Sequence, residues 1–340
     1  MTLQSSGQIS FSQIRDEFGA NDGSAVSLGR YRNTSSSFSN KNVGSLSDLP
    51  LDTGVPKSGT ISASSFYGKR LNIVVDFHSG GTETRVSASN RYSANDVQVV
   101  GGYTGRPSSA AGKRVIVHVN KTIGSETGGN DRCGLRTGGW HPNTYSVEIE
   151  IGPNGKIYGA GGKGGDGGNA NGSGGANGNP GSSAIGIGLM GNSTVQKINN
   201  LGRIQAGYGG GGGGNGARYW IQSGKKSGGW HGSTGGGGGG GAGVPSSNGG
   251  DSPGGAYGSG SNGSDGGNGS DINSGNGGGG GNSAGSGGNG AVVNNSSTSG
   301  QGAGGSGGAN GYAIMTAHGS LPTITGNAVI GRTITSSNPQ

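Results

Sequence analysis

Hydrophobic and polar residues alternate in four short segments between residues 71 and 151, a pattern typical of β-strands. Glycine pairs and the sequence Pro153-Asn154-Gly155 supply turns between these segments. The pattern predicts a small antiparallel β-domain over residues 71–158, with no helix of usable length. The valine- and isoleucine-rich segments are residues 71–77, 97–100, 114–119 and 145–151. Similar segments at 311–315 and 329–334 predict closing strands in a C-terminal region, residues 311–340.

Residues 1–70 hold few apolar positions and a short repeat, S-G-x-I-S-x-S, at residues 6–12 and 58–64. Ser10 and Gln13 have the spacing of a capping box, which predicts a short helix near residues 11–18. Because so few apolar residues cannot bury a core of their own, we expect this segment to dock on another protein as an attachment arm. The expected docking residues are Ile9, Phe11, Ile14, Phe18, Ile61, Phe66 and Tyr67.

Glycine dominates residues 159–310, and 66 of the 88 glycines lie between residues 151 and 320. Such a composition is typical of a flexible linker. Collagen is excluded, because the three-residue glycine period breaks at Ala170 and proline is scarce. The segment instead combines Gly-Gly-X triplets after Gly161 with pure glycine runs at 209–214, 235–241 and 277–281.

The three-residue period matches a polyproline-II-like helix, which has three residues per turn and no internal hydrogen bonds. Its N–H and C=O groups therefore point to neighbouring chains. The pattern predicts a sandwich of stacked polyglycine-II helices, with pure glycine inside and Gly-Gly-X at the rim. Ordering the backbone costs roughly 1–2 kcal/mol per residue, so hydrogen bonds between the helices must offset that cost. A second repeat, residues 147–158 and 195–204, leads from strand and turn into each glycine run.

An insert at residues 217–231 interrupts the glycine and holds two of the three tryptophans. Flat aromatic rings beside cations suit sugar rings and anionic groups. The alternative is that Trp220 and Trp230 pack on each other and close a loop. The candidate receptor-binding residues, including one from a later insert, are Arg218, Tyr219, Trp220, Lys225, Lys226, Trp230, His231 and Tyr257.

Charge and apolar patterning exclude several classes of protein. The 23 basic and 16 acidic residues give a net charge of +7, but no element concentrates the positive residues, so no nucleic-acid partner is expected. No stretch approaches the roughly 18 apolar residues that a membrane span needs. The start MTLQSSGQIS lacks the features of a signal peptide. Cys133 is the single cysteine, which excludes an internal disulfide and favours a buried, inert thiol.

No pattern supports catalysis, so we expect no enzyme, no cofactor and no metal. His141 and His231 have no carboxylate or cysteine at a supportive spacing. Residues 161–166 fit the opening of a calcium-binding glycine repeat. However, Gly168 occupies its apolar position and only four acidic residues follow position 150, too few for a calcium roll.

Glycine runs that follow the turn Asn154-Gly155-Lys156-Ile157 and alternate with short aromatic inserts resemble the polyglycine-II sandwich of the distal tail-fibre adhesins of T-even-like bacteriophages. The S-G-x-I-S-x-S segments are similar to the opening segments of small tail proteins of tailed phages. The resemblance covers residues 145–320 by pattern and 5–68 by motif. One departure is that those adhesins dock on a separate fibre, whereas this chain carries its own arm.

The resemblance implies a virion protein of the phage tail, made in the host cytoplasm without a signal peptide. Its arm, residues 1–70, would attach to other phage tail proteins. Loops between glycine helices of the module at 159–310 would bind a bacterial surface glycan or outer-membrane protein. Fibre attachment implies a homotrimer, or a monomer on a trimeric stem. A structural tail component or fibre adaptor without host contact is the alternative function.

Overall fold

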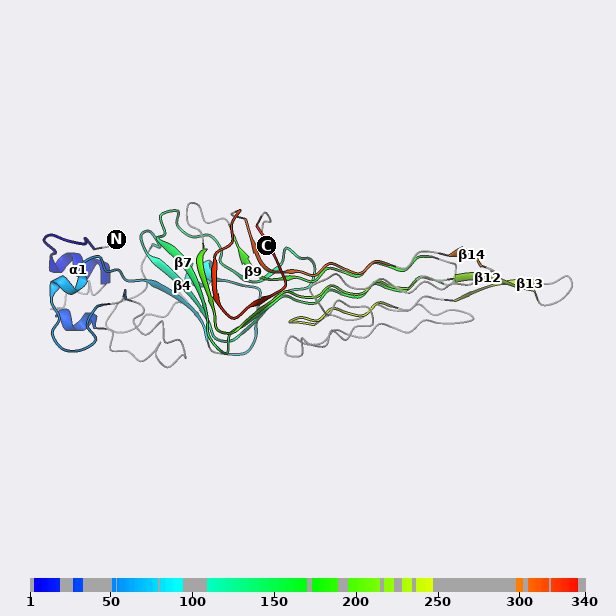
Figure 1. The fold of residues 1–340 in the computed structure, drawn as a ribbon, viewed down its shortest axis with the longest axis horizontal. Helices are drawn as coiled ribbons and strands as arrows, with labels where there is room; N and C mark the ends of the chain where they lie inside the picture. Colours follow the sequence, from blue (N-terminus) through cyan, green and yellow to red (C-terminus); the bar gives the residue numbers. More distant parts are fainter. Residues whose placement is uncertain are drawn as a thin grey trace.

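The protein is elongated, with a small helical unit at one end, three β-sheets in the middle and extended glycine-rich runs reaching away from them (Figure 1). Among the described residues, no helix is long and apolar enough to cross a membrane. The computed structural model describes residues 3–18, 27–32, 51–52, 54–78, 80–93, 109–169, 173–188, 195–214, 217–222, 228–233, 237–246, 298–301, 305–317 and 319–335.

The three central sheets have five strands each, and every strand pairing within them is parallel. In spatial order, the first contains β1 (Ile73–Phe77), β4 (Arg114–Val119), β7 (Ser146–Ile151), β10 (Val195–Asn200) and β16 (Thr323–Gly326). The second contains β17 (Val329–Ile330), β11 (Arg203–Gln205), β8 (Lys156–Tyr158), β5 (Thr122–Gly124) and β2 (Glu83–Thr84). The third contains β18 (Arg332–Ile334), β15 (Tyr312–Thr316), β9 (Ser183–Ile187), β6 (Cys133–Arg136) and β3 (Val86–Ser87).

The chain visits the first, second and third sheet in turn and then stacks the next coil on the previous one. We call this part the β-helix. The expected mostly-β fold is confirmed, but the expected antiparallel arrangement is wrong. The short turns lead to the next sheet instead of back along the same one, so each strand meets its equivalent in the following coil. The expected strand at 97–100 lies outside the described residues, and a six-residue helix, α2 (Ala88–Ser93), precedes that segment.

The core of the β-helix is filled by alternate residues from all three sheets. Ile149 lies between Val117 and Ile198 in the register of the first sheet, and all three are fully buried. The sequence repeat at 147–158 and 195–204 forms two consecutive coils, because Ile157 pairs with Ile204 in the second sheet. Burying one such side chain contributes about 1.5–3 kcal/mol, so apolar stacking stabilises this region.

One corner of the β-helix carries the glycine-rich insertions. The link from the second sheet to the third is one residue in the first coil, Arg85, and one in the last, Gly331. In the coils between them it runs over residues 125–132, 159–182 and 206–311. The glycine runs are therefore insertions of the third and fourth coils at one corner.

The N-terminal unit has its own small core, so the expectation that it cannot build one is wrong. Its elements are α1 (Phe11–Phe18), η1 (Leu28–Tyr31) and η4 (Ala63–Phe66). Phe18, Tyr31 and Phe66 are fully buried, with ring centroids 5.5–6.1 Å apart. Three aromatic rings bury large areas, which compensates for the small number of apolar residues.

The predicted N-terminal helix is confirmed together with its capping box. The Ser10 N–H donates to Gln13 Oε1 at 2.8 Å, and the Gln13 N–H donates to Ser10 Oγ at 3.2 Å. The second copy of the repeat forms the same box at the start of η4, between Ser62 and Ser65. The repeated sequence therefore encodes a repeated helix start.

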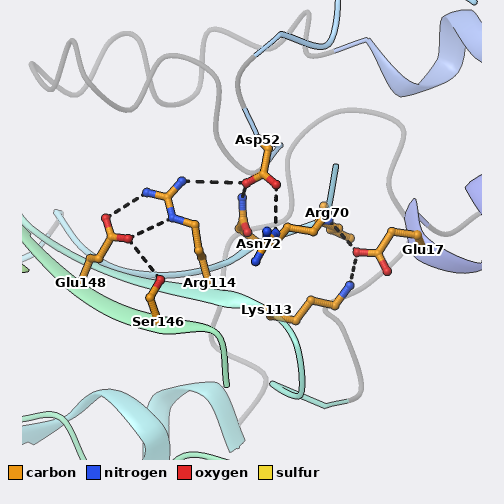
Figure 2. A network of polar contacts seen from close by, with 9 residues as sticks. Glu17, Asp52, Arg70, Asn72, Lys113, Arg114, Ser146 and Glu148 are labelled. Atoms are coloured by element: carbon orange, nitrogen blue, oxygen red, sulfur yellow. Dashed lines mark hydrogen bonds and ion pairs between the residues drawn. The ribbon is translucent and has the colours of Figure 1, made fainter. Parts of the chain in front are cut away.

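Charged side chains join the N-terminal unit to the β-helix (Figure 2). Glu17 of α1 forms a buried ion pair with Lys113, just before β4, and accepts a hydrogen bond from the Leu71 N–H at 2.8 Å. Asp52 accepts a hydrogen bond at 2.8 Å from Asn72, just before β1, and lies 3.9 Å from the guanidinium of Arg114 in β4. Both carboxylates lie in the N-terminal unit, so the unit is fixed to the end of the sheets through specific polar contacts.

Candidate binding site at the tip of the glycine extension

Five described runs of the two insertions lie side by side and form what we call the glycine extension (Figure 1). Its runs are residues 159–169, 173–182, 206–214, 237–246 and 305–311. Backbone hydrogen bonds join neighbouring runs at intervals of three residues. The N–H groups of Gly162, Gly165 and Gly168 donate to the carbonyls of Tyr208, Gly211 and Gly214, each at 2.8 Å.

The run 206–214 lies at the centre and is buried throughout. It bonds to all four other runs, for example through the Gly210 N–H to the Asn179 carbonyl at 2.9 Å. The Gly211 N–H donates to the Gly239 carbonyl at 2.7 Å, and the Gly210 carbonyl accepts from Gly308 at 2.8 Å. Asp166 and Asn177, on outer runs, are exposed. The six consecutive glycines of the central run, residues 209–214, are therefore buried, while exposed side chains such as Asp166 and Asn177 lie on outer runs.

Close packing explains why these positions are glycine. A Cβ atom at Gly210 would lie 2.1 Å from the Lys163 carbonyl oxygen, and one at Gly241 would lie 1.9 Å from that of Tyr208. The positive φ angles of other glycines in the protein do not occur at these two positions. Glycine is therefore required at these positions because the neighbouring backbone lies so close, and not because the chain adopts a left-handed conformation there.

A small aromatic cluster anchors the extension where it leaves the β-helix. Tyr158, Tyr208 and Ala242 are buried together, with Val244 packed against them. Burial raises the pKa of both tyrosines, more than the positive charge of Arg203 lowers it. Gln205 donates to the Tyr208 hydroxyl at 3.3 Å. The base of the extension therefore combines side-chain packing with backbone hydrogen bonds.

A three-stranded antiparallel sheet, which we call the tip sheet, lies at the far end of the extension (Figure 1). It consists of β13 (Gly228–Ser233), β12 (Ala217–Gln222) and β14 (Thr298–Gln301). The hairpin pairs Trp220 with Trp230 and Tyr219 with His231. The insert noticed in the sequence is thus a hairpin, and its third strand comes from a much later part of the chain.

The structure brings five of the expected receptor-binding residues into this hairpin, namely Arg218, Tyr219, Trp220, Trp230 and His231. Lys225, Lys226 and Tyr257 lie outside the described residues. The direct opposition of Trp220 and Trp230 in the register is compatible with both interpretations of the insert, binding and loop closure.

The expected docking residues divide into two groups. Ile14, Phe18 and Phe66 are fully buried in the N-terminal core. Phe11 is 42% exposed, and Ile9, Ile61 and Tyr67 are partly exposed. A contact with another protein can therefore use only the second group, which lies at the start of α1 and around η4.

Other reactive side chains are buried in the β-helix. His118 Nδ1 lies 2.8 Å from Asp76, which also contacts His78 at 2.6 Å. Asp76 and His118 are register partners on β1 and β4, and this contact follows from the strand pairing and not from any spacing in the sequence. Cys133 is buried as expected, and burial raises the pKa of its thiol to about 12. No group of three His, Cys, Asp or Glu side chains within the described ranges has the arrangement of a metal site.

Comparisons with known proteins give one structural likeness. No family model matches the sequence. No curated protein matches it either. Among solved structures, the chain is similar to the gp37-gp38 adhesin tip complex of the bacteriophage S16 long tail fiber, with 19% sequence identity and a TM-score of 0.38. That similarity covers 86% of this chain and 93% of the other.

Proposed function

We propose that the protein is a phage tail-fibre or tail-tip adhesin that binds a receptor on the bacterial surface through the tip sheet. One observation carries the proposal: the aromatic and basic hairpin lies at the free end of the glycine extension, with the N-terminal unit at the opposite end of the molecule (Figure 1). A long spacer between the N-terminal unit and the tip sheet suits a protein that is anchored at one end and binds a distant surface with the other.

The extension is a polyglycine-II sandwich in this proposal. Hydrogen bonds between runs recur every three residues, the repeat of a three-residue-per-turn helix. In the central run the N–H groups of Gly207, Gly210 and Gly213 donate to carbonyl groups of a neighbouring run, so backbone hydrogen bonds stabilise the frame beyond the side-chain packing at its base. Such a frame holds the tip sheet at a defined position, which reduces the entropy lost when a ligand binds.

The hairpin offers two chemically distinct faces. Register partners in an antiparallel pair lie on the same side of a sheet, so positions 220 and 230 share one face and positions 219 and 231 the other. Tryptophan positions on one face suit the apolar side of sugar rings. Arg218 adds a donor for carboxylate or phosphate groups. The receptor is therefore a surface glycan or an outer-membrane protein carrying such groups.

The N-terminal unit attaches to other phage tail proteins in this proposal. Phe11, which is 42% exposed, and the partly exposed Ile9, Ile61 and Tyr67 form the contact. The protein acts in the virion tail as a homotrimer, or as a monomer on a trimeric stem. It has no enzymatic activity, and it binds neither nucleic acid nor the membrane interior. A purely structural tail protein is the competing function, because the same frame could act as a spacer.

Binding of purified protein to susceptible cells, with competition against phage adsorption, tests the proposal. The double variant Trp220→Ala with Trp230→Ala replaces both tryptophans of the tip sheet. Tyr145→Ala, which removes a 59% exposed aromatic outside the extension, is the control. We expect loss of at least about tenfold in cell binding for the double variant and little change for the control, as for loss of an aromatic hot spot. Folded wild-type protein that does not bind cells would assign the chain to the structural class.

A further inference from the structure

A small polar cavity lies on the outer face of the third sheet of the β-helix, apart from the tip sheet. Its volume is about 220 Å³, and it is lined by Arg136, Ser87, Ser89, Asn90 and four glycines. This volume is below the roughly 300–1,000 Å³ of sites for drug-sized ligands, and suits one small polar molecule. The lining consists of hydrogen-bonding groups and glycine, with no apolar side chain.

The strand register explains why the cavity exists. Arg136 follows Leu135, which is fully buried in the core, so Arg136 is on the outward side of β6. Its neighbours across the sheet are Ser87 on β3 and Gly186 on β9. Gly186 has no side chain, so it leaves space beside Arg136 on one side, while Ser87 provides a hydroxyl on the other, and all three residues line the cavity.

The guanidinium of Arg136 has unused hydrogen-bonding capacity. Its Nη2 donates to the Arg85 carbonyl at 3.3 Å, while its Nε is buried without a partner in the described part of the protein. Arg85 has a φ of +51°, unusual for a residue other than glycine, and its N–H donates to the Gly124 carbonyl at 3.0 Å. The strained turn therefore directs its carbonyl to Arg136 and positions the guanidinium.

Positive charge exceeds negative charge around the cavity. The carboxylate of Glu126 forms ion pairs with both Arg85, at 2.9 Å, and Arg132, at 2.7 Å, so its negative charge is already balanced by two arginines. Burial, and then the positive charge of Arg85, lower the pKa of Arg136. Arginine nevertheless stays protonated at neutral pH, so the site holds a cation whose charge is poorly compensated.

We infer that this cavity, the Arg136 pocket, binds the carboxylate of an acidic monosaccharide, a uronic acid. The planar guanidinium matches a carboxylate, and Ser87, Ser89 and Asn90 supply partners for sugar hydroxyls. The whole cavity of about 220 Å³ corresponds to about seven water molecules at roughly 30 Å³ each, enough for one monosaccharide. The pocket gives the β-helix a saccharide contact of its own, so the inference does not rest on the function proposed for the tip sheet.

The glycines at the rim keep the pocket open. A Cβ atom at Gly138, whose φ is +73°, would lie 1.7 Å from Ser89 Oγ. A Cβ atom at Gly139 meets nothing within 4 Å. A side chain at position 139 is therefore tolerated by the backbone and can enter the space of the ligand, which gives a variant that blocks the pocket without touching Arg136.

Calorimetric titration of the full chain at low salt with glucuronate, glucose, acetate and glucose 6-phosphate tests the inference. We expect millimolar binding of glucuronate, and at least about tenfold weaker binding of glucose and acetate, since each lacks one half of the contacts. Arg136→Gln should weaken glucuronate binding by at least about tenfold. Arg132→Gln removes a partly exposed arginine that pairs with Glu126 and does not line the pocket, and it should change glucuronate binding by less than about twofold.

Thermal unfolding establishes that each variant is folded. If Arg136→Gln does not fold, Ser89→Ala and Gly139→Leu replace it, and both should weaken glucuronate binding. Folded wild-type protein that binds glucuronate no better than glucose, or folded variants that bind it as the wild type does, would overturn the inference. Tighter binding of glucose 6-phosphate than of glucuronate would overturn the assignment of a carboxylate ligand.

Discussion

The glycine extension leaves the β-helix at one corner, yet the two regions are stabilised in opposite ways. In the β-helix, buried side chains such as Ile149 and Val117 stack from coil to coil. In the extension, the run 206–214 is as well buried, but almost all of its contacts are between backbones. The first region depends on the hydrophobic effect and the second on satisfied hydrogen bonds at close approach.

This difference predicts different sensitivity to substitution. A core position of the β-helix loses stability when side-chain volume is removed. A central position of the extension loses stability when any side-chain volume is added, because the next backbone already occupies the place of a Cβ atom. Gly210→Ala tests this contrast in the extension, and Ile149→Ala tests it in the β-helix.

Gly210→Ala should have the largest effect. Its Cβ atom would lie 2.1 Å from the Lys163 carbonyl oxygen and 2.5 Å from the carbonyl carbon, so two runs must separate and lose their hydrogen bonds. We expect destabilisation of about 4 kcal/mol or more, among the largest effects of single substitutions. Urea unfolding and limited proteolysis of the extension measure it. Gly81→Ala, in a turn with nothing within 4 Å of the added atom, is the control.

Lys113→Ala tests the buried ion pair that fixes the N-terminal unit. The change removes the buried cation that offsets the charge of Glu17, whose side chain is 1% exposed against 5% for that of Lys113. We expect a cost of about 3–5 kcal/mol and earlier proteolysis of the N-terminal unit. The double variant Glu17→Gln with Lys113→Met should be more stable than Lys113→Ala. Equal stability of the two variants would show that the uncompensated charge of Glu17 is not the cause of the loss in Lys113→Ala.

Ile149→Ala tests the side-chain half of the contrast. Removing this fully buried residue creates a cavity between two coils, and we expect a cost of about 2–5 kcal/mol. Leu201→Ala, at a position that is 42% exposed, should cost about 0.5 kcal/mol or less. Denaturant midpoints compare the two. Similar losses in both variants would show that the β-helix does not depend on its stacked interior.

Glu148→Gln should have the smallest effect, visible as a change in acid sensitivity. Burial by itself would raise the pKa of Glu148, but the hydrogen bonds from Arg114, at 3.0 and 2.9 Å, and its charge lower the pKa below the ordinary value of 4.5. The stability from this pair is therefore present above about pH 4.5 and disappears as the pH falls through the lowered pKa.

The carboxyl group of Glu148 is partly exposed, so we expect the pair to contribute about 1 kcal/mol or less. The variant should be less stable than the wild type near pH 7, and the difference should vanish in acid. Melting temperatures measured between pH 3 and 7 give this comparison. A constant difference over that range would exclude the ion pair as its cause.

Local patterns in the sequence predicted local structure well. The capping box at Ser10 concerns neighbouring residues, so its hydrogen bonds could be derived directly. The insert with Trp220 and Trp230 was visible for the same reason. Its third strand, β14, was not, because no pattern in β12 indicates a partner from residues 298–301.

Long-range pairing could not be derived from the sequence. Alternation around Val147 and Ile149 predicts a strand but does not say whether its neighbour runs parallel, and its partner β10 lies beyond an insertion. The Arg136 pocket depends on the same register, because only the pairing of β6 with β9 places Gly186 beside Arg136. The N-terminal core was missed because few residues form it, although three of them are large aromatics.

Hydrogen exchange of individual glycine amides, followed by NMR, tests most directly the claim that hydrogen bonds between runs hold the extension together. The N–H groups of Gly207, Gly210 and Gly213 donate to Ser182, Asn179 and Ala176, each at 2.9 Å. We predict that these amides exchange as slowly as the core amides of the β-helix, such as that of Ile149. Exchange of the three glycine amides at the rate of an unfolded chain, while Ile149 stays protected, would contradict it.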